Sequence, residues 1–209
     1  MKRFVFYLPV LALVAALTGC GGDTYRPSGR ADGHDYVDLG LRMKWATCNV
    51  GADSPADAGR YYAWGEVETP GDGVYNQVNC KTYGRHFGTV GGRELYDVAR
   101  ACWGEAWRMP SEEDMRALVD SCTWTWSSFS GREGYRVTGP NGNSIFLPAV
   151  GYRDGEMLYD DGTTGFYWSA TPNEERVQLS YALSFNPGRR EASWSGCRYD
   201  GFPVRPVMK

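Results

Sequence analysis

The chain has 209 residues, of which 22 are Lys or Arg and 25 are Asp or Glu, and its formal net charge is −3. This acidic balance argues against a nucleic-acid-binding role, which normally shows a basic footprint, and it offers no polybasic patch for a membrane surface. The composition, with 27 Gly, 14 Tyr and 8 Trp, is typical of short strands joined by tight turns.

The N-terminal segment has the pattern of a secretory signal rather than of a membrane-spanning helix. Lys2 and Arg3 form a positive start, and a nearly continuous apolar run follows from Phe4 to Leu17. Residues 17–20 resemble a bacterial lipobox, in which the cysteine becomes the lipidated first residue; an ordinary signal peptide with a chance cysteine is the alternative. We therefore predict a lipoprotein signal peptide at 1–19, lipidation at Cys20, a polar tether at 20–33 and one domain at 34–209.

The first part of the expected domain combines short strands with a long loop. Residues 36–39, 43–47 and 61–64 have the composition of strands. Residues 65–90 hold several Gly and few periodic apolar positions, which predicts a long loop. A first helix is expected where one apolar stripe recurs at helical spacing, at Leu95, Val98, Ala99 and Cys102.

The second expected helix has a clear start signal. Ser111 follows Pro110 and is a good N-cap, and the three acids at 112–114 place negative charge where the helix dipole favours it. These carboxylates resemble an acid/base cluster, but capping explains them more simply. The apolar stripe of this helix consists of Met115, Leu118, Val119 and Cys122.

Beyond residue 123 the apolar period changes to that of strands. Strands are expected at 124–126, 135–138 and 144–147, with a hairpin turn at 139–143. A second strand pair is expected at 157–159 and 166–168, around a turn at 160–162. Clean alternation over 177–185 indicates a strand with one buried face, followed by a turn at 186–188. Residues 189–202 show no period, which predicts an irregular contact surface held by a rigid frame.

A series of segments, taken in order, resembles the Fibrobacter succinogenes major paralogous domain family. These segments are Asp35–Leu41, Lys44–Ala52, Tyr62–Glu66, Trp107–Ser111, Thr138–Asn143, Tyr167–Ser169 and Val204–Val207. Such proteins are common as secreted lipoproteins of gut Bacteroidetes, and the family looks related to the fold of formylglycine-generating enzymes. The resemblance implies an α+β, C-type lectin-like fold with two helices, short mixed or antiparallel sheets and long loops.

Some members of this family are targets of diversity-generating retroelements, which vary a C-terminal, ligand-contacting segment. By this resemblance, the frame positions would be Leu183, Phe185, Arg198, Gly201, Val204 and Arg205. The exposed ligand contacts would be Arg189, Arg190, Glu191, Ser193, Trp194, Ser195, Tyr199 and Asp200. The retroelement link is a hypothesis, which a nearby near-copy of this coding segment, differing at adenines, would support.

The tryptophans divide into two groups. Trp194 lies among charged residues and is expected at a contact, because Trp, Tyr and Arg are enriched at binding hot spots. For Arg189 and Arg190, a solvated turn is an equal alternative to a contact. The remaining tryptophans lie near strand or helix signals and are expected to pack the core: Trp45, Trp64, Trp103, Trp107, Trp124, Trp126 and Trp168.

Residues that could support catalysis or bind metal are sparse. The two histidines, His34 and His86, lack a Gly-x-Ser-x-Gly elbow, and no C-x-x-C pair indicates zinc or redox chemistry. Formylglycine-generating enzymes use a cysteine pair near the C-terminal core, where this chain has only Cys197. Residues 171–174 lack the leading acid of the calcium-dependent lectin motif, and a turn explains 160–162 better than a calcium site. We therefore expect no catalytic activity, no cofactor and no metal site.

These observations favour a lipid-anchored binding module of the cell envelope, carried as an outer-membrane lipoprotein. Its expected partner is a macromolecule or glycan at the cell surface, reached through the C-terminal segment, and not a nucleic acid. A structural or adhesive envelope component without a dedicated ligand, and an enzyme of the formylglycine-generating type, are the alternatives. Disulfide pairing stays open, and an odd number of cysteines leaves at least one thiol over: Cys48, Cys80, Cys102, Cys122 and Cys197.

Overall fold

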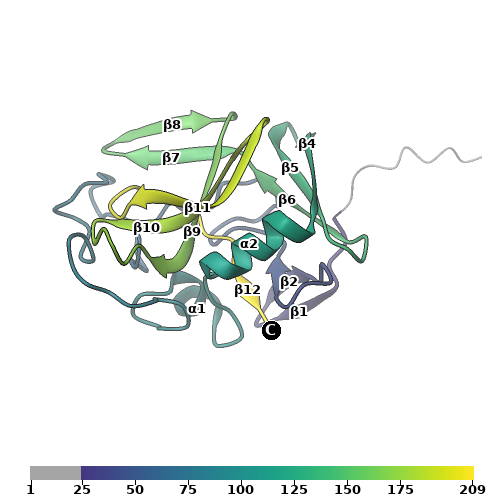
Figure 1. The fold of residues 1–209 in the computed structure, drawn as a ribbon, viewed down its shortest axis with the longest axis horizontal. Helices are drawn as coiled ribbons and strands as arrows, with labels where there is room; N and C mark the ends of the chain where they lie inside the picture. Colours follow the sequence, from purple (N-terminus) through teal and green to yellow (C-terminus); the bar gives the residue numbers. More distant parts are fainter. Residues whose placement is uncertain (1–24) are drawn as a thin grey trace, which may run out of the picture.

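A computed structural model describes residues 25–209, so the predicted signal peptide and the lipidation site at Cys20 lie outside the described residues. The described part is α+β, rich in sheet, with two helices and three small sheets (Figure 1). The predicted class is therefore confirmed at the α+β level. No helix of residues 25–209 is long and apolar enough to cross a membrane.

A four-stranded antiparallel sheet joins the two ends of the described chain. Its strands follow the order β1-β2-β3-β12 and comprise β1 (Gly29–Ala31), β2 (His34–Val37), β3 (Lys44–Ala46) and β12 (Val207–Met208). The predicted tether boundary at residue 33 is wrong in this respect, because Gly29–Ala31 pairs with His34–Tyr36. The turn uses Asp32 and Gly33, both at positive φ, which permits this tight hairpin.

Helix α1 (Val98–Trp103) is shorter than its predicted stripe. Asp97 is its N-cap and accepts hydrogen bonds from the backbone of Ala99 and Arg100. The helix therefore starts after Leu95, which lies outside it and is 77% exposed. Cys102 is also exposed, so the predicted stripe is wrong at both ends, and Trp103 is the buried C-terminal residue of the helix instead.

Helix α2 (Glu112–Ser121) confirms the predicted start. Ser111 and Asp114 form a capping box, in which each side chain accepts from the backbone of the other residue. Burial favours the neutral form of Asp114, yet hydrogen bonds from Ser111 and the ion pair with Arg108, at 2.8 Å, hold the pKa of that carboxyl below its usual value. The acids thus stabilise the helix start, and Met115 and Leu118 lie in the core.

A three-stranded antiparallel sheet follows α2. Its strands are β4 (Thr123–Phe129), β5 (Arg132–Thr138) and β6 (Ser144–Pro148), in that order. The turn at 139–143 closes the β5–β6 hairpin, with the Gly139 amide donating to the Asn143 carbonyl at 2.9 Å, so this hairpin is confirmed. A Cβ at Gly139 would lie 2.0 Å from the Leu39 carbonyl oxygen, which explains a glycine at this close approach.

A five-stranded sheet has the order β11-β10-β9-β7-β8. It comprises β7 (Val150–Asp154), β8 (Met157–Asp161), β9 (Gly165–Pro172), β10 (Leu179–Asn186) and β11 (Arg189–Cys197). The predicted pairing of 157–159 with 166–168 is wrong, because β8 pairs with β7. Gly155, at φ 58°, makes the tight β7–β8 turn, and β9 instead joins β7 in parallel and β10 in antiparallel pairing.

The segment predicted to be irregular is largely regular. Residues 189–197 form the edge strand β11, hairpinned to β10 through the predicted turn at 186–188. The register shifts between Ala182 and Ser184, where β11 carries an extra residue. Such a bulge reverses the face to which the following side chains point, which hides the period of two in the sequence.

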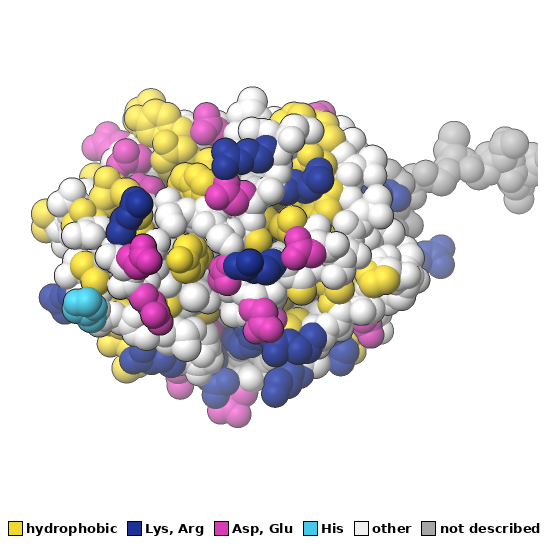
Figure 2. All heavy atoms as spheres, viewed as in Figure 1, with side chains coloured by type: hydrophobic (Ala, Val, Ile, Leu, Met, Phe, Trp, Pro, Cys, Tyr) yellow, Lys and Arg dark blue, Asp and Glu magenta, His cyan; other side chains and the backbone are white. Residues whose placement is uncertain are grey.

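Two hydrophobic clusters hold the sheets and helices together. One places α2 against β5, β6, β9 and β10, with Met115, Leu118, Tyr167 and Phe185 among its members. The other joins α1 to β9 and the C-terminal residues, through Trp107, Trp168 and Phe202. All seven tryptophans expected in the core lie in these clusters or pack against them. On the face shown in Figure 2, acidic and basic side chains are intermixed, and hydrophobic side chains gather over β8.

Candidate ligand-binding site

The end of the β10–β11 hairpin carries the most exposed of the predicted contact residues. Arg189 forms an ion pair with Glu191, and the Arg190 guanidinium lies 5.7 Å from the centroid of the Tyr135 ring. Arg189 and Arg190 are both exposed, and Glu191 is half-buried. These charged groups therefore already interact with one another and with their own domain, as the solvated-turn alternative predicts.

The middle of β11 is packed rather than free. Ser193 donates a hydrogen bond to Glu112 on α2, and Ser195 accepts one from Asn173 Nδ2 at 3.2 Å. Trp194 is half-buried, with its ring centroid 4.9 Å from Phe166 and 5.8 Å from Phe202. The predicted exposure of Trp194 is therefore wrong, because the bulge turns it towards the hydrophobic cluster around Phe202, and its role as a ligand contact stays a prediction.

Asp200 is also buried, which contradicts its predicted exposure. Its side chain is 8% exposed. Burial, together with the nearby negative charge of Asp154, raises the pKa of the Asp200 carboxyl to about 7, while a hydrogen bond from the Cys197 backbone opposes the shift. Asp200 is therefore an interior residue, and the predicted contact that lines a cavity is its neighbour in the chain, Tyr199.

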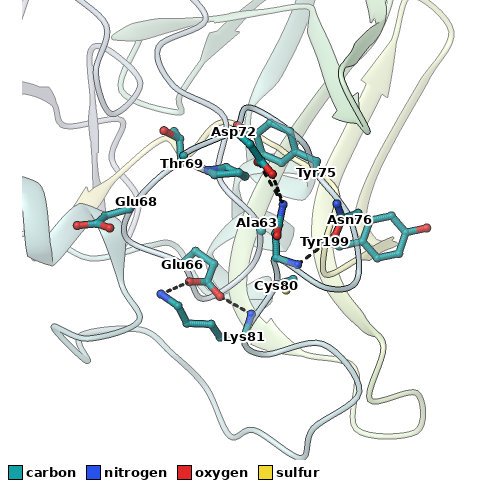
Figure 3. Close-up of a pocket in the computed structure, with 13 residues that line it drawn as sticks. Ala63, Glu66, Glu68, Thr69, Asp72, Tyr75, Asn76, Cys80, Lys81 and Tyr199 are labelled. Carbon is teal, nitrogen blue, oxygen red and sulfur yellow. Dashed lines mark hydrogen bonds and ion pairs between the residues drawn. The ribbon is translucent and has the colours of Figure 1, made fainter.

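Tyr199 lines a cavity of about 310 Å³, which we call the loop cavity. The opposite wall is the loop of residues 66–81, predicted only as a long loop (Figure 3). The Tyr199 ring packs edge-on against Tyr83 at 5.4 Å, which fixes its place at the rim. Long ordered loops of this kind are often functional. The length of the loop was the one feature of the sequence that pointed to a functional role for these residues.

Hydrogen bonds make the loop wall rigid. Glu66 is largely buried and accepts from the Lys81 amide at 2.7 Å, while the Lys81 ammonium lies 3.2 Å from its second oxygen. Asp72 accepts from the Val74 amide at 3.0 Å and from Asn79 Nδ2 at 3.2 Å. A loop fixed in this way presents its polar groups to a ligand without a large ordering cost.

The floor of the loop cavity is built by Tyr75. Its hydroxyl donates to the Tyr61 carbonyl at 2.7 Å, and its amide donates to the Gly155 carbonyl at 2.9 Å. The ring lies so close to Gly201 that a Cβ there would be 2.5 Å from Cε1. A glycine is therefore needed at the frame position Gly201, because any larger residue would displace the Tyr75 ring that lines the cavity.

The other predicted frame positions are buried as well. Leu183, Phe185 and Val204 lie in the core at no more than 1% exposure. Arg198 and Arg205 are each 1% exposed and donate mainly to backbone carbonyls. All these positions are buried, and the neighbours of Tyr199 on both sides, Arg198 and Asp200, are buried too.

The cysteines form no disulfide within residues 25–209. Burial raises the pKa of the Cys80 and Cys197 thiols, which disfavours the reactive thiolate form. The same part of the chain holds no group of three or more His, Cys, Asp or Glu side chains suited to a metal ion. His34 stacks on Trp103 at 3.8 Å, a packing role at the entry of the domain.

Comparison of the chain with protein-family models, with curated proteins and with solved structures found no match. The geometry itself therefore carries the functional argument. It separates the predicted contacts into three groups: a hairpin end at 189–191 with Arg189 and Arg190 exposed, packed side chains at Ser193, Trp194, Ser195 and Asp200, and the cavity residue Tyr199.

Proposed function

We propose that this chain is a lipid-anchored binding module of the cell envelope, with a C-type lectin-like arrangement, that holds its ligand in the loop cavity. The observation that carries the proposal is the position of Tyr199. It lies at the rim of a cavity of about 310 Å³, between firmly buried neighbours and opposite a hydrogen-bonded loop. A fixed aromatic side chain among polar groups is a common design for a ligand site.

The lining suits a ligand rich in hydroxyl or amino groups, such as a glycan or an exposed part of a macromolecule. Glu66, Asp72 and Asn79 provide carboxylate and amide groups that form directional hydrogen bonds, and Tyr199 provides an aromatic face. The hairpin end at 189–191, where Arg189 and Arg190 are exposed, would widen the contact surface. Diversification of this segment by a retroelement remains part of the proposal, tested by a search of the flanking DNA for the near-copy.

The binding test uses the purified protein on arrays of host glycans and envelope polymers. Tyr199→Ala should lower affinity for the ligand found there by about tenfold or more, as expected when a hot-spot aromatic is truncated. The matched control is Tyr159→Ala, since Tyr159 is an exposed tyrosine on β8. Equal binding by both variants and the unmodified chain, with unchanged melting temperatures, would overturn the site assignment.

Anchoring is tested separately. Labelled palmitate should be incorporated into the protein in a bacterial host, and the change Cys20→Ser should abolish both incorporation and membrane fractionation. Incorporation that survives this change would contradict a lipid at Cys20.

A structural or adhesive component of the envelope is the second candidate, favoured by strand β8. Every residue of β8 is exposed, including Met157, Leu158 and Tyr159, and the strand forms one edge of its sheet. Exposed apolar edge strands readily pair with other chains. Light scattering at increasing protein concentration distinguishes the two, because Leu158→Lys should abolish self-association only under the adhesive alternative.

A further inference from the structure

Arg198 is a buried cation that none of the carboxylates in residues 25–209 neutralises. Its Nε donates to the Leu179 carbonyl at 3.1 Å and to Ser180 Oγ at 3.0 Å. Its Nη1 donates to the carbonyls of Thr82, at 3.1 Å, and Arg85, at 2.8 Å. The guanidinium carbon lies 4.3 Å from the centroid of the Trp64 ring. These contacts fix the orientation of the guanidinium, but the groups that accept its hydrogen bonds are all uncharged.

The second terminal nitrogen of Arg198 remains available. None of the hydrogen bonds that Arg198 makes within residues 25–209 uses Nη2. Arg198 lines a cavity of about 400 Å³, which we call the Arg198 hollow. The other walls come from two separate loops, through His86, Phe87, Gly88, Glu174 and Val177. A buried guanidinium with two free N–H donors therefore borders a space large enough for a small ligand.

Arg205 provides an internal comparison. It is equally buried, at 1% exposure, and is held by Asn49 Oδ1 at 2.8 Å and by the carbonyls of Ala46 and Thr47. Its Nη2 is enclosed and has no hydrogen-bond partner within residues 25–209. The two arginines thus share a mode of attachment, and Arg198 differs in that it borders a hollow.

We propose that the Arg198 hollow binds a ligand carboxylate, which pairs with the guanidinium of Arg198 through Nη2. Guanidinium–carboxylate hydrogen bonds are charge-assisted and are stronger than those between neutral groups. A buried charge without a counter-ion is costly, so a bound carboxylate offsets that cost. This site is separate from the loop cavity. The backbone carbonyl of Arg198 accepts hydrogen bonds from Trp64 and from Cys80, which lines the loop cavity, whereas the Arg198 side chain lines the hollow.

The walls favour a singly charged ligand. Glu174 is exposed at the hollow and repels anions, which penalises a dianion such as phosphate more than a monocarboxylate. Phe87 and Val177 add apolar surface suited to the body of the ligand. A uronic acid, with one carboxylate on a compact ring, combines these features and is the probe that we choose.

The test is a titration of the ¹⁵N-labelled protein with glucuronate, followed by NMR of the arginine Nε–H signals. The Arg198 signal should shift in a saturable way, while the Arg205 signal stays in place as the internal control. Glucose, which lacks the carboxylate, should cause no shift, and inorganic phosphate should bind more weakly. These signals are read in the unmodified protein, so the test does not require a variant of Arg198, which could fail to fold.

A pair of neighbouring glutamates supplies a matched control. Glu174→Gln removes the repulsive charge at the hollow and should tighten glucuronate binding by roughly two- to fivefold at low salt. Glu175 is also exposed but does not line the hollow, so Glu175→Gln should change the affinity by less. Absence of an Arg198 shift, an equal shift of Arg205, phosphate binding as tight as that of glucuronate, or equal effects of the two variants would each overturn the proposal.

Discussion

Asp200 makes the stability of this protein depend on pH in a defined direction. Its carboxyl has a pKa of about 7 in the folded chain, against the usual 3.8, because it is buried and lies near Asp154. The folded state therefore binds a proton more tightly than the unfolded state. The contribution of Asp200 to stability is fully present below about pH 4, and it is lost as the pH rises towards about 7.

The change Asp200→Asn keeps the shape of the side chain and removes its charge. At pH 4.5 the folded wild-type carboxyl is mostly protonated but the unfolded one is mostly ionised, so the variant should differ by only about 1 kcal/mol in its free energy of unfolding. At pH 8 the wild type carries a buried charge and the variant does not. The difference between a pKa of about 7 and 3.8 corresponds to at most about 4 kcal/mol, so the variant should be more stable at pH 8 by up to that amount.

Urea unfolding followed by tryptophan fluorescence at pH 4.5, 6 and 8 measures this difference directly. Asp154→Asn should give a smaller effect in the same direction, because burial is the larger cause of the raised pKa. A difference between Asp200→Asn and wild type that is the same at pH 4.5 and pH 8, or a variant that is less stable at pH 8, would refute the reasoning.

Three further predictions concern stability, each checked by urea unfolding at pH 7. Asp97 accepts hydrogen bonds from four backbone amides, including that of Met109 at 3.0 Å. Asp97→Asn should therefore lower the free energy of unfolding by about 2–4 kcal/mol, whereas Glu94→Gln, at an exposed control position, should change it by no more than about 0.5 kcal/mol. Ser111→Ala removes the N-cap of α2 and should cost about 1 kcal/mol; no loss would contradict the capping box. Gly165→Ala places a Cβ 2.1 Å from the Phe185 ring and should cost about 1–3 kcal/mol, so a neutral change would contradict the close packing.

Local signals predicted those elements whose determinants lie within a few residues. The start of α2 at Ser111 and the hairpin turn at 139–143 depend on caps and turn residues, and both are confirmed. The pairing of β8 could not be predicted, because it depends on the Gly155 turn outweighing the equally plausible turn at 160–162. Which strands pair is thus decided by competition between possible turns, and a single sequence does not show which turn is the more stable.

The candidate site was predicted only in part, for a similar reason. The frame residues were predicted from the family resemblance alone, and the structure buries all of them. The bulge between the Ala182 and Ser184 pairs reverses the face of β11 and moves Trp194 inwards, an effect with no clear sequence signal. The wall formed by residues 66–81 meets Tyr199 only through tertiary contacts, so no local pattern connects the two.

The four-stranded sheet has a consequence for the order of events during synthesis. β12 contains Val207 and Met208, and it pairs with β3, which lies far earlier in the sequence, at Lys44 and Trp45. Val204 and Phe202 likewise bond to Val50 and Tyr62. The sheet can therefore close only after residues 207 and 208 have left the ribosome, and until then β3 has β2 as its single neighbour in this sheet.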